Sequence, residues 1–146
     1  MDFQVDKIEF VDTFPFFQSL FHNLSALTID EKISLWHKKY ISKFPELKEK
    51  VISEYEINGY DWEKIAKEMV FHRVEEDFSK MVKAHENILK LHFSIEKEIF
   101  DKLKVFLDIK RVLYIGLGNG AGWVDYYEGK RAILYGLEKI AELGWH

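Results

Sequence analysis

Helical stripes occupy most of the first three quarters of the chain. Apolar side chains recur every three or four residues through most of residues 28–108, which is the pattern of helices that bury one face. Thr28 and Glu31 form a Thr-x-x-Glu capping box, so we expect the first of these helices to begin there. Its apolar stripe consists of Ile29, Ile33, Trp36 and Tyr40.

A second helix is expected to begin within residues 42–46. Pro45 favours this start, because the first turn of a helix leaves its N–H groups unpaired and proline has none to lose. Asn58 and Gly59 form a turn signal that would end this helix.

The longest helix is expected after that turn. Asp61 can cap its start, and Ser94 can cap a fourth helix that Asp108 closes. Apolar residues of the long helix alternate at spacings of three and four, which predicts a stripe facing other helices. The stripe consists of Phe71, Val74, Phe78, Met81, His85, Ile88 and His92.

Strand patterns lie at both ends of the chain. Residues 3–11 place apolar side chains among charges and suit an N-terminal strand. Residues 111–118 contain four consecutive apolar side chains followed by glycine, which indicates a buried strand. The glycines within residues 118–122 then allow a tight loop with backbone angles that other residues rarely adopt.

A hairpin is expected after that loop. Residues 123–127 can pair antiparallel with residues 131–135 across the turn at residues 128–130, and a helical pattern follows at residues 137–143. The chain therefore predicts an α+β fold in a single domain. Its mostly helical N-terminal three quarters would hold about four helices and a candidate strand, and a short antiparallel strand and hairpin region would follow.

Residues 1–146 are expected to form a single domain. Residues 1–108 are expected to be mainly helical, and residues 109–146 are expected to form a strand, a loop, a hairpin and a short helix.

Charge and composition exclude some classes of partner. The net charge is −4 and the sequence pI is about 5.9, so no basic excess exists to neutralise the phosphates of a nucleic acid. No apolar run approaches the roughly 20 residues that a membrane span needs. The absence of cysteine, and a start without the basic-then-apolar order of a signal peptide, favour a cytoplasmic location. Abundant lysine and glutamate would also suit a heat-loving host.

His85 and His92 are the candidate metal ligands. Both lie on the stripe of the long helix, where leucine or isoleucine would be expected, and could join ligands from a neighbouring helix. Their spacing of seven residues is two helical turns, about 10.5 Å along the axis, which is too far for both to bind one ion. The alternative is a pair of core histidines that form local hydrogen bonds.

A second polar set lies on the same predicted helix. Glu68, His72, Glu75 and Glu76 share a helix surface, and carboxylate–histidine sets bind iron or manganese in helix bundles. The chain has no Glu-x-x-His pattern, which favours a solvated charged face.

The glycine-rich segment VLYIGLGNG resembles the first motif of the S-adenosylmethionine-dependent methyltransferases. Gly116, Gly118 and Gly120 fit that motif, and the resemblance implies that Glu138 would bind the ribose hydroxyls of the cofactor. Residues 121–130 depart from it, because they form a poor helix where the family has a good one. This hypothesis also fails if that segment folds as a hairpin.

A second resemblance covers the last quarter of the chain. The stretch YIGLGNGAGWVDYYEGKRAILYGLEKIAELGWH resembles the segment just before the metal-binding helix in a family of zincin-like zinc metallopeptidases of bacteria and archaea. In that family a strand, a glycine loop, a hairpin and a short helix precede a helix with His-Glu-x-x-His. The resemblance implies a loop near the cleft at residues 118–123 and, at residues 132–136, a rim strand that pairs with an extended peptide. The implied substrate-binding residues are Gly118, Asn119, Gly120, Trp123, Ala132 and Leu134.

The chain departs from this family at the catalytic motif. His85 and Glu86 are followed by Asn87 and by no second histidine, and the chain has no His-Glu-x-x-His elsewhere. Two imidazoles one turn apart and a glutamate are what zinc hydrolysis requires, so we expect no catalytic residues and no cofactor in this chain. Either zinc would belong to a longer parent protein, which would be a zinc-dependent hydrolase, or the chain would come from a lineage that lost catalysis.

Three hypotheses of function remain open from the sequence. The first is the N-terminal region of a zincin-like metallopeptidase, inactive without its metal-binding helix, with a peptide substrate or a second copy as partner. The second is a methyltransferase-like cofactor binder. The third is a small helical binding or structural protein that is complete at 146 residues.

Overall fold

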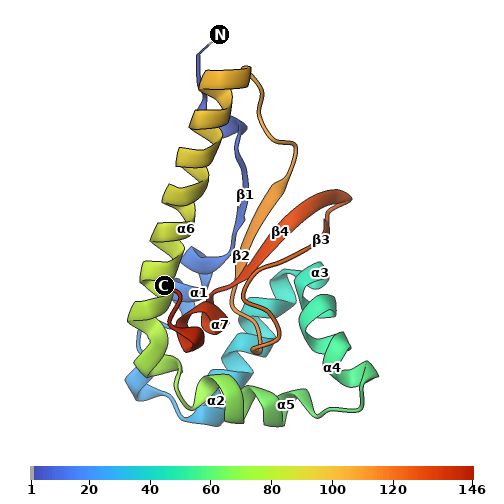
Figure 1. Cartoon of the computed structure of the whole chain (residues 1–146). Helices are drawn as coiled ribbons and strands as arrows, with labels where there is room; N and C mark the ends of the chain where they lie inside the picture. Colours follow the sequence, from blue (N-terminus) through green and yellow to red (C-terminus); the bar gives the residue numbers. More distant parts are fainter. Residues whose placement is uncertain (1) are drawn as a thin grey trace.

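A mixed four-stranded sheet organises the fold, in the order β1-β2-β4-β3 (Figure 1). The computed structural model describes residues 2–146. Strands β1 (Glu9–Asp12), β2 (Lys110–Tyr114) and β4 (Lys130–Gly136) run parallel to one another. Strand β3 (Trp123–Tyr127) pairs antiparallel with β4, which confirms the expected hairpin.

Helices surround this sheet and make up most of the chain before β2, so the fold is α+β with a mainly helical first part, as the sequence predicts. Three of the helices continue as π-helical segments, which span Trp36–Tyr40, Glu49–Ser53 and Ala66–Phe71. The helices are α1 (Phe14–Leu20), α2 (Ile29–Leu35), α3 (Pro45–Lys48), α4 (Glu54–Ile57), α5 (Trp62–Ile65), α6 (Val74–Leu103) and α7 (Leu137–Leu143).

Local signals set the helix starts that the sequence predicts. The Thr28 hydroxyl accepts a hydrogen bond from the Glu31 N–H (3.2 Å), and the Glu31 carboxylate accepts one from the Thr28 N–H (3.0 Å). This reciprocal pair is the expected capping box at the start of α2. Pro45 is the first residue of α3, and Gly59 has a φ of 78° in the turn that ends the following helix.

The longest helix begins later than the sequence predicts. Asp61 caps α5, where its side chain accepts from the Glu63 N–H (3.0 Å), but that helical segment ends at Phe71. Helix α6 runs without a break from Val74 through the exposed Ser94 to Leu103, so the expectation of a separate fourth helix from Ser94 to Asp108 is wrong. Both Phe71 and Val74 are fully buried, so the break lets the shorter segment pack against α2 while α6 follows the sheet.

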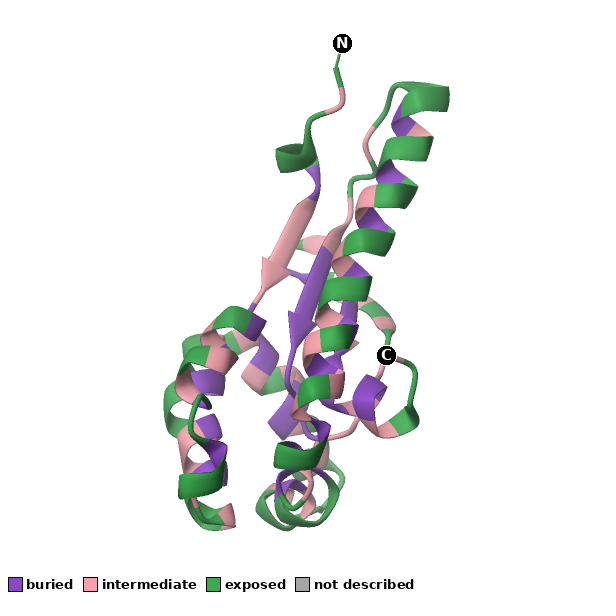
Figure 2. Ribbon diagram, turned by 90° about the vertical axis from the view of Figure 1, so that its left-hand side faces the viewer, coloured by how far each residue is buried: buried purple, intermediate pink, exposed green. Residues whose placement is uncertain are grey.

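Helix α6 covers one face of the sheet. Successive side chains of a strand point to opposite faces, and on this face Arg111 of β2 pairs with Glu96 of α6 while Tyr135 of β4 bonds to His92. The long helix lies along the side of β1 and β2 (Figure 1). Strand β2 is buried along nearly its whole length, whereas β1 is only half buried (Figure 2).

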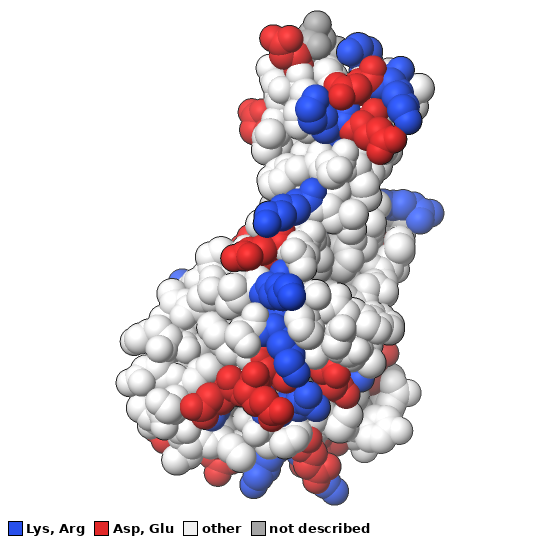
Figure 3. Space-filling model, turned by 60° about the vertical axis from the view of Figure 1, so that its left-hand side comes forward, with Lys and Arg blue, Asp and Glu red and all other residues white. Residues whose placement is uncertain are grey.

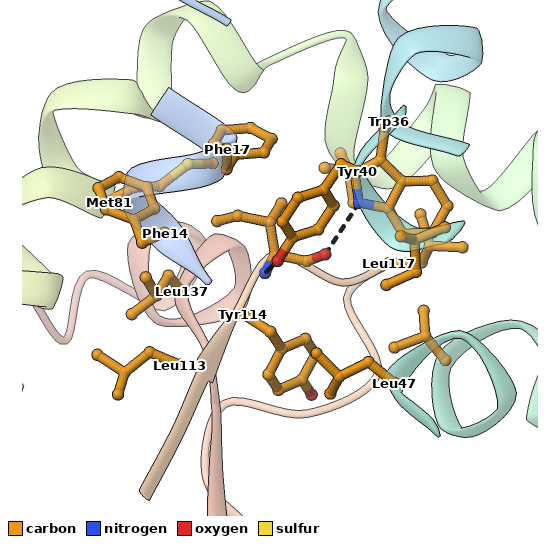
Figure 4. Close-up of a cluster of buried hydrophobic side chains, with 14 of the residues drawn as sticks. Phe14, Phe17, Trp36, Tyr40, Leu47, Met81, Leu113, Tyr114, Leu117 and Leu137 are labelled. Atoms are coloured by element: carbon orange, nitrogen blue, oxygen red, sulfur yellow. Dashed lines mark hydrogen bonds between the residues drawn. The ribbon is translucent and has the colours of Figure 1, made fainter. Parts of the chain in front are cut away.

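The other face of the sheet is covered by helices from the first part of the chain. The Trp36 indole N–H donates to the Ile115 carbonyl (2.9 Å), and the Ile115 N–H donates to the Tyr40 hydroxyl (2.9 Å), just beyond the end of β2 (Figure 4). All three residues are fully buried. Each such buried hydrogen bond contributes about 1 kcal/mol and fixes where the helices meet the strand.

Charged side chains are distributed without a strong bias of sign. At the narrow end, where α6 ends, lysine and carboxylate side chains are intermixed on the face drawn in Figure 3. Ion pairs there include Lys97 with Asp101 and Lys102 with Glu98. Within residues 2–146, no helix combines the length and the apolar character that crossing a membrane requires.

Candidate functional site

The glycine loop between β2 and β3 is held by a buried carboxylate. The N–H groups of Gly116 and Gly118 donate to the two oxygens of Glu138, at 2.8 and 2.9 Å. Glu138 is only 4 % exposed and lies in the first turn of α7. Gly118 has a φ of 80°, and a Cβ on Gly136 would lie 2.2 Å from the Gly120 carbonyl oxygen, so glycine is required at both positions.

Burial changes the acidity of the groups around this loop. Burial raises the pKa of Glu138 to about 7, although the hydrogen bonds from the loop oppose this shift. The pKa of Tyr114 is raised first by its own burial and then by the nearby Glu138 carboxylate. The Glu138 carboxylate is therefore an internal support of the loop, and both of its oxygens already have partners.

The structure divides the residues implied as substrate-binding into two groups. Gly118, Asn119, Gly120 and Trp123 lie in the loop or at the start of β3 and are partly exposed. The Asn119 amide donates to Glu54 (3.1 Å). Ala132 and Leu134 lie in β4 and are fully buried.

Strand β4 does not form the rim that the sequence analysis assigned to residues 132–136. β4 pairs with β2 on one side and with β3 on the other, so neither of its backbone edges is free to bind a peptide. The assignment is wrong because the chain returns after the hairpin into the interior of the sheet, parallel to β2. The sheet has two edge strands, β1 and β3, so within the hairpin the edge strand is β3, Trp123–Tyr127.

The turn of the hairpin determines which groups β3 presents at its edge. Glu128 and Gly129 both have positive φ, 50° and 76°, in the two-residue turn between paired Tyr127 and Lys130. Such a turn closes on a hydrogen-bonded pair, and bonded and non-bonded pairs then alternate along the ladder. The N–H and C=O groups of Val124 and Tyr126 therefore point away from β4. Their side chains are 61 % and 56 % exposed.

One stripe of the helical segment that begins with α3 runs beside β3. The Glu128 N–H donates to Glu46 (2.7 Å), and Lys50 donates to Asp125 (2.9 Å). Further along, the Glu54 carboxylate accepts a hydrogen bond from the Asn119 amide. The helix therefore contacts the hairpin turn, β3 and the glycine loop in succession. A shallow groove of about 400 Å³ lies on this helix, lined by Glu46, Glu49, Lys50, Ser53, Glu54, Ile57 and Asn58.

Asp125 lies between the edge of β3 and this helix. Its Oδ1 accepts from the outward N–H of Tyr126 (2.7 Å), and its Oδ2 accepts from Lys50 (2.9 Å). Both bonds stabilise the carboxylate, so the pKa of Asp125 is lowered, first by the bond to Lys50. Trp123 lies on the same side of the strand, with the Lys50 ammonium 6.0 Å from its ring centre.

The candidate metal ligands lie on the other side of the sheet, and both bond to it. The His85 ring bonds to Asp12 (2.6 Å), and the His92 ring bonds to the Tyr135 hydroxyl (2.7 Å). The pKa of His92 is lowered, first by burial and then by Arg111, which keeps the ring neutral. Within residues 2–146 no group of three or more histidine or acidic residues is placed to hold a metal ion.

Calorimetric titration with zinc tests this arrangement directly. We expect no binding tighter than roughly micromolar, because each imidazole has a partner on the sheet and a tetrahedral site needs more ligands than either can recruit. A His85→Ala, His92→Ala double variant should give the same isotherm. Stoichiometric binding that the double variant loses would show that the histidines leave their partners to bind metal.

The second polar set is exposed. Glu68 and His72 line an open groove of about 940 Å³ between α2 and α5, and Glu75 contacts Lys32 at 3.9 Å. Glu76 is also exposed. These four side chains therefore form a charged surface that is exposed to solvent.

The methyltransferase hypothesis needs a central parallel strand before the glycine loop, which β2 provides, and a helix after the loop, which is absent at residues 120–130. Residues 120–130 form the end of the loop and the first strand of the hairpin, where that hypothesis requires a helix. The carboxylate that it assigns to the ribose is enclosed beneath the loop instead.

Of the residues at this edge, the sequence singled out Trp123 but not Val124, Asp125 or Tyr126. The turn signal and the strand-like sequence at Trp123–Tyr127 predicted a strand. No sequence pattern, however, shows which side of a strand remains unpaired. The contact of Lys50 with Asp125 joins positions 75 residues apart and depends on the tertiary fold.

Comparison of the chain with family models, with curated proteins and with solved structures gave no match.

Proposed function

We propose that this chain is the peptide-binding N-terminal region of a zincin-like metallopeptidase, and that it binds an extended peptide along the edge of β3. The metal-binding helix of such an enzyme is not among these 146 residues, and the chain is not expected to hydrolyse the peptide by itself.

The order of the elements supports the family assignment. β2, the glycine loop, the β3–β4 hairpin and α7 follow one another as the resemblance implies. The single observation that carries peptide binding is the unpaired edge of β3, which the loop adjoins. The rim function that the resemblance places on the hairpin then belongs to β3.

An extended peptide can add to this edge as a further strand. The outward N–H and C=O groups of Val124 and Tyr126 offer backbone hydrogen bonds that do not depend on the peptide's sequence. Side chains of the peptide would alternate between two surroundings, because successive residues of a strand point to opposite faces. One set would face the helix that carries Lys50, and the other would face solvent beside Val124.

Val124→Pro tests the edge. Proline removes the outward N–H of residue 124, whereas the pairing of β3 with β4 uses the neighbouring residues. We expect the variant to bind a capped, fluorescein-labelled eight-residue peptide of alternating threonine and alanine roughly fivefold more weakly, since one backbone hydrogen bond contributes about 1 kcal/mol. Fluorescence anisotropy gives the dissociation constants.

Val124→Ala is the matched control, because it shortens the same side chain and keeps the N–H. Its affinity should stay close to that of the unmodified chain, and circular dichroism should show that both variants are folded. Equal affinity of the proline and alanine variants would exclude binding at this edge.

The reading frame beyond codon 146 tests the family assignment separately. A His-Glu-x-x-His motif shortly downstream would support it. An immediate stop codon would exclude an active enzyme of this family and support the third hypothesis, a small binding or structural protein.

A further inference from the structure

We infer that the groove beside β3 selects peptides with a lysine or arginine side chain directed at Asp125, and that Lys50 occupies the place of that side chain in the free protein. This inference rests on the proposed peptide binding at the same edge and adds the chemistry of the residue that is recognised.

The charges at and next to the groove favour a cation. The helix that lines the groove carries Glu46, Glu49 and Glu54. Asp125 of β3 lies next to it and bonds to Lys50 of the lining. Lys50 is the one cationic side chain among the groove-lining residues. A peptide with a basic residue at this position would therefore meet opposite charge, and one with an acidic residue would meet like charge.

The bonds of Asp125 show why a basic residue on the peptide would favour pairing. Asp125 covers the outward N–H of Tyr126, which an added strand must reach. An incoming peptide has to turn this carboxylate away from the edge. A lysine or arginine on the peptide would give the displaced carboxylate a new partner, in place of the Lys50 ammonium that now lies 2.9 Å away.

The Trp123 ring also favours a basic side chain on the peptide. The Lys50 ammonium lies 6.0 Å from the centre of the Trp123 ring, at the limit of a cation–π contact. A basic side chain that entered from the open edge would find the same ring beside Asp125.

A second copy of the chain fits this edge less well. In the antiparallel pairing of two β3 strands with the longest overlap, residue 125 lies at the twofold axis. Asp125 would then face its own equivalent, and like charges directly opposite each other destabilise a strand pair. The charge pattern therefore favours a basic peptide over self-pairing.

The test compares two capped, labelled octapeptides that differ only in a central lysine or glutamate, with binding measured by fluorescence anisotropy. We expect the unmodified chain to bind the lysine peptide roughly fivefold more tightly, with the difference shrinking at high salt. Lys50→Ala should tighten binding of the lysine peptide, because the internal competitor is removed.

A charge exchange provides the sharper variant. The double variant Lys50→Glu, Asp125→Lys keeps an ion pair between the helix and β3 but reverses the charge at the edge, so its preference should shift toward the glutamate peptide. Asp125→Asn should bring the two affinities closer together, with circular dichroism as the check of folding.

The outcomes separate this inference from the proposed function. Equal binding of both peptides that Val124→Pro still weakens would refute the basic preference and leave peptide binding intact. A preference that is the same in the double variant would also refute it. Binding of neither peptide would overturn both proposals.

Discussion

Replacing Glu96 by alanine is expected to lower the free energy of unfolding by about 3–5 kcal/mol. Glu96 of α6 and Arg111 of β2 form an ion pair in which both side chains are essentially inaccessible to solvent. Glu96 also accepts from the Leu107 N–H (3.3 Å), and Arg111 donates to the Ile109 carbonyl (2.8 Å). Without the carboxylate, the guanidinium stays buried with its charge uncompensated.

Urea unfolding followed by circular dichroism measures this effect. Glu98→Ala is the control on the same helix, because the Glu98 pair with Lys102 is mostly exposed and its loss should change stability little. A Glu96→Leu, Arg111→Met double variant should recover most of the loss, since no buried charge then remains. A loss in Glu96→Ala no larger than that in Glu98→Ala would show that water reaches Arg111.

Raising the pH from about 4.5 to 7 is expected to cost the protein about 3 kcal/mol of stability through Glu138. Burial raises the pKa of this carboxyl from 4.5 in the unfolded chain to about 7 in the fold. The folded state therefore binds more protons between these values. The stabilising contribution is complete below pH 4.5 and is lost as the pH rises through 7.

Glu138→Gln isolates this effect, because glutamine keeps one oxygen for the loop amides and does not titrate. The difference in unfolding free energy between the two proteins should change with pH over this interval. Other groups, such as the neutral His92, contribute equally to both proteins and cancel. A difference that stays constant from pH 4.5 to 8 would show that the N–H groups of Gly116 and Gly118 keep the carboxylate ionised throughout.

If the proposed binding is correct, the two sides of the sheet have different tasks. The side toward α6 contains the buried pair of Glu96 with Arg111 and the histidine bonds, which join helix to strand. The other side carries the edge of β3, where Asp125 and Lys50 meet. Substitutions on the first side should act on stability, and substitutions of Asp125 and Lys50 on the second should act on binding.

Much of the secondary structure could be predicted because its signals are local. The capping box at Thr28, the proline at the start of α3 and the apolar stripe of α6 act within one or two turns. The break before Val74 could not be predicted in the same way. No glycine or proline marks it, and it arises where two helices must pack on different neighbours.

The sequence by itself determined the hairpin, the glycine loop and the α+β class, because turn residues and hydrophobic periods act between near neighbours. Only the tertiary structure decided that β4 lies inside the sheet and that β3 lies at one of its two edges. Strand order depends on which distant segments pair, and an apolar strand such as Ala132 to Leu134 suits an interior position next to either neighbour. For the same reason the meeting of Lys50 with Asp125 became visible only once the helix and the hairpin were packed together.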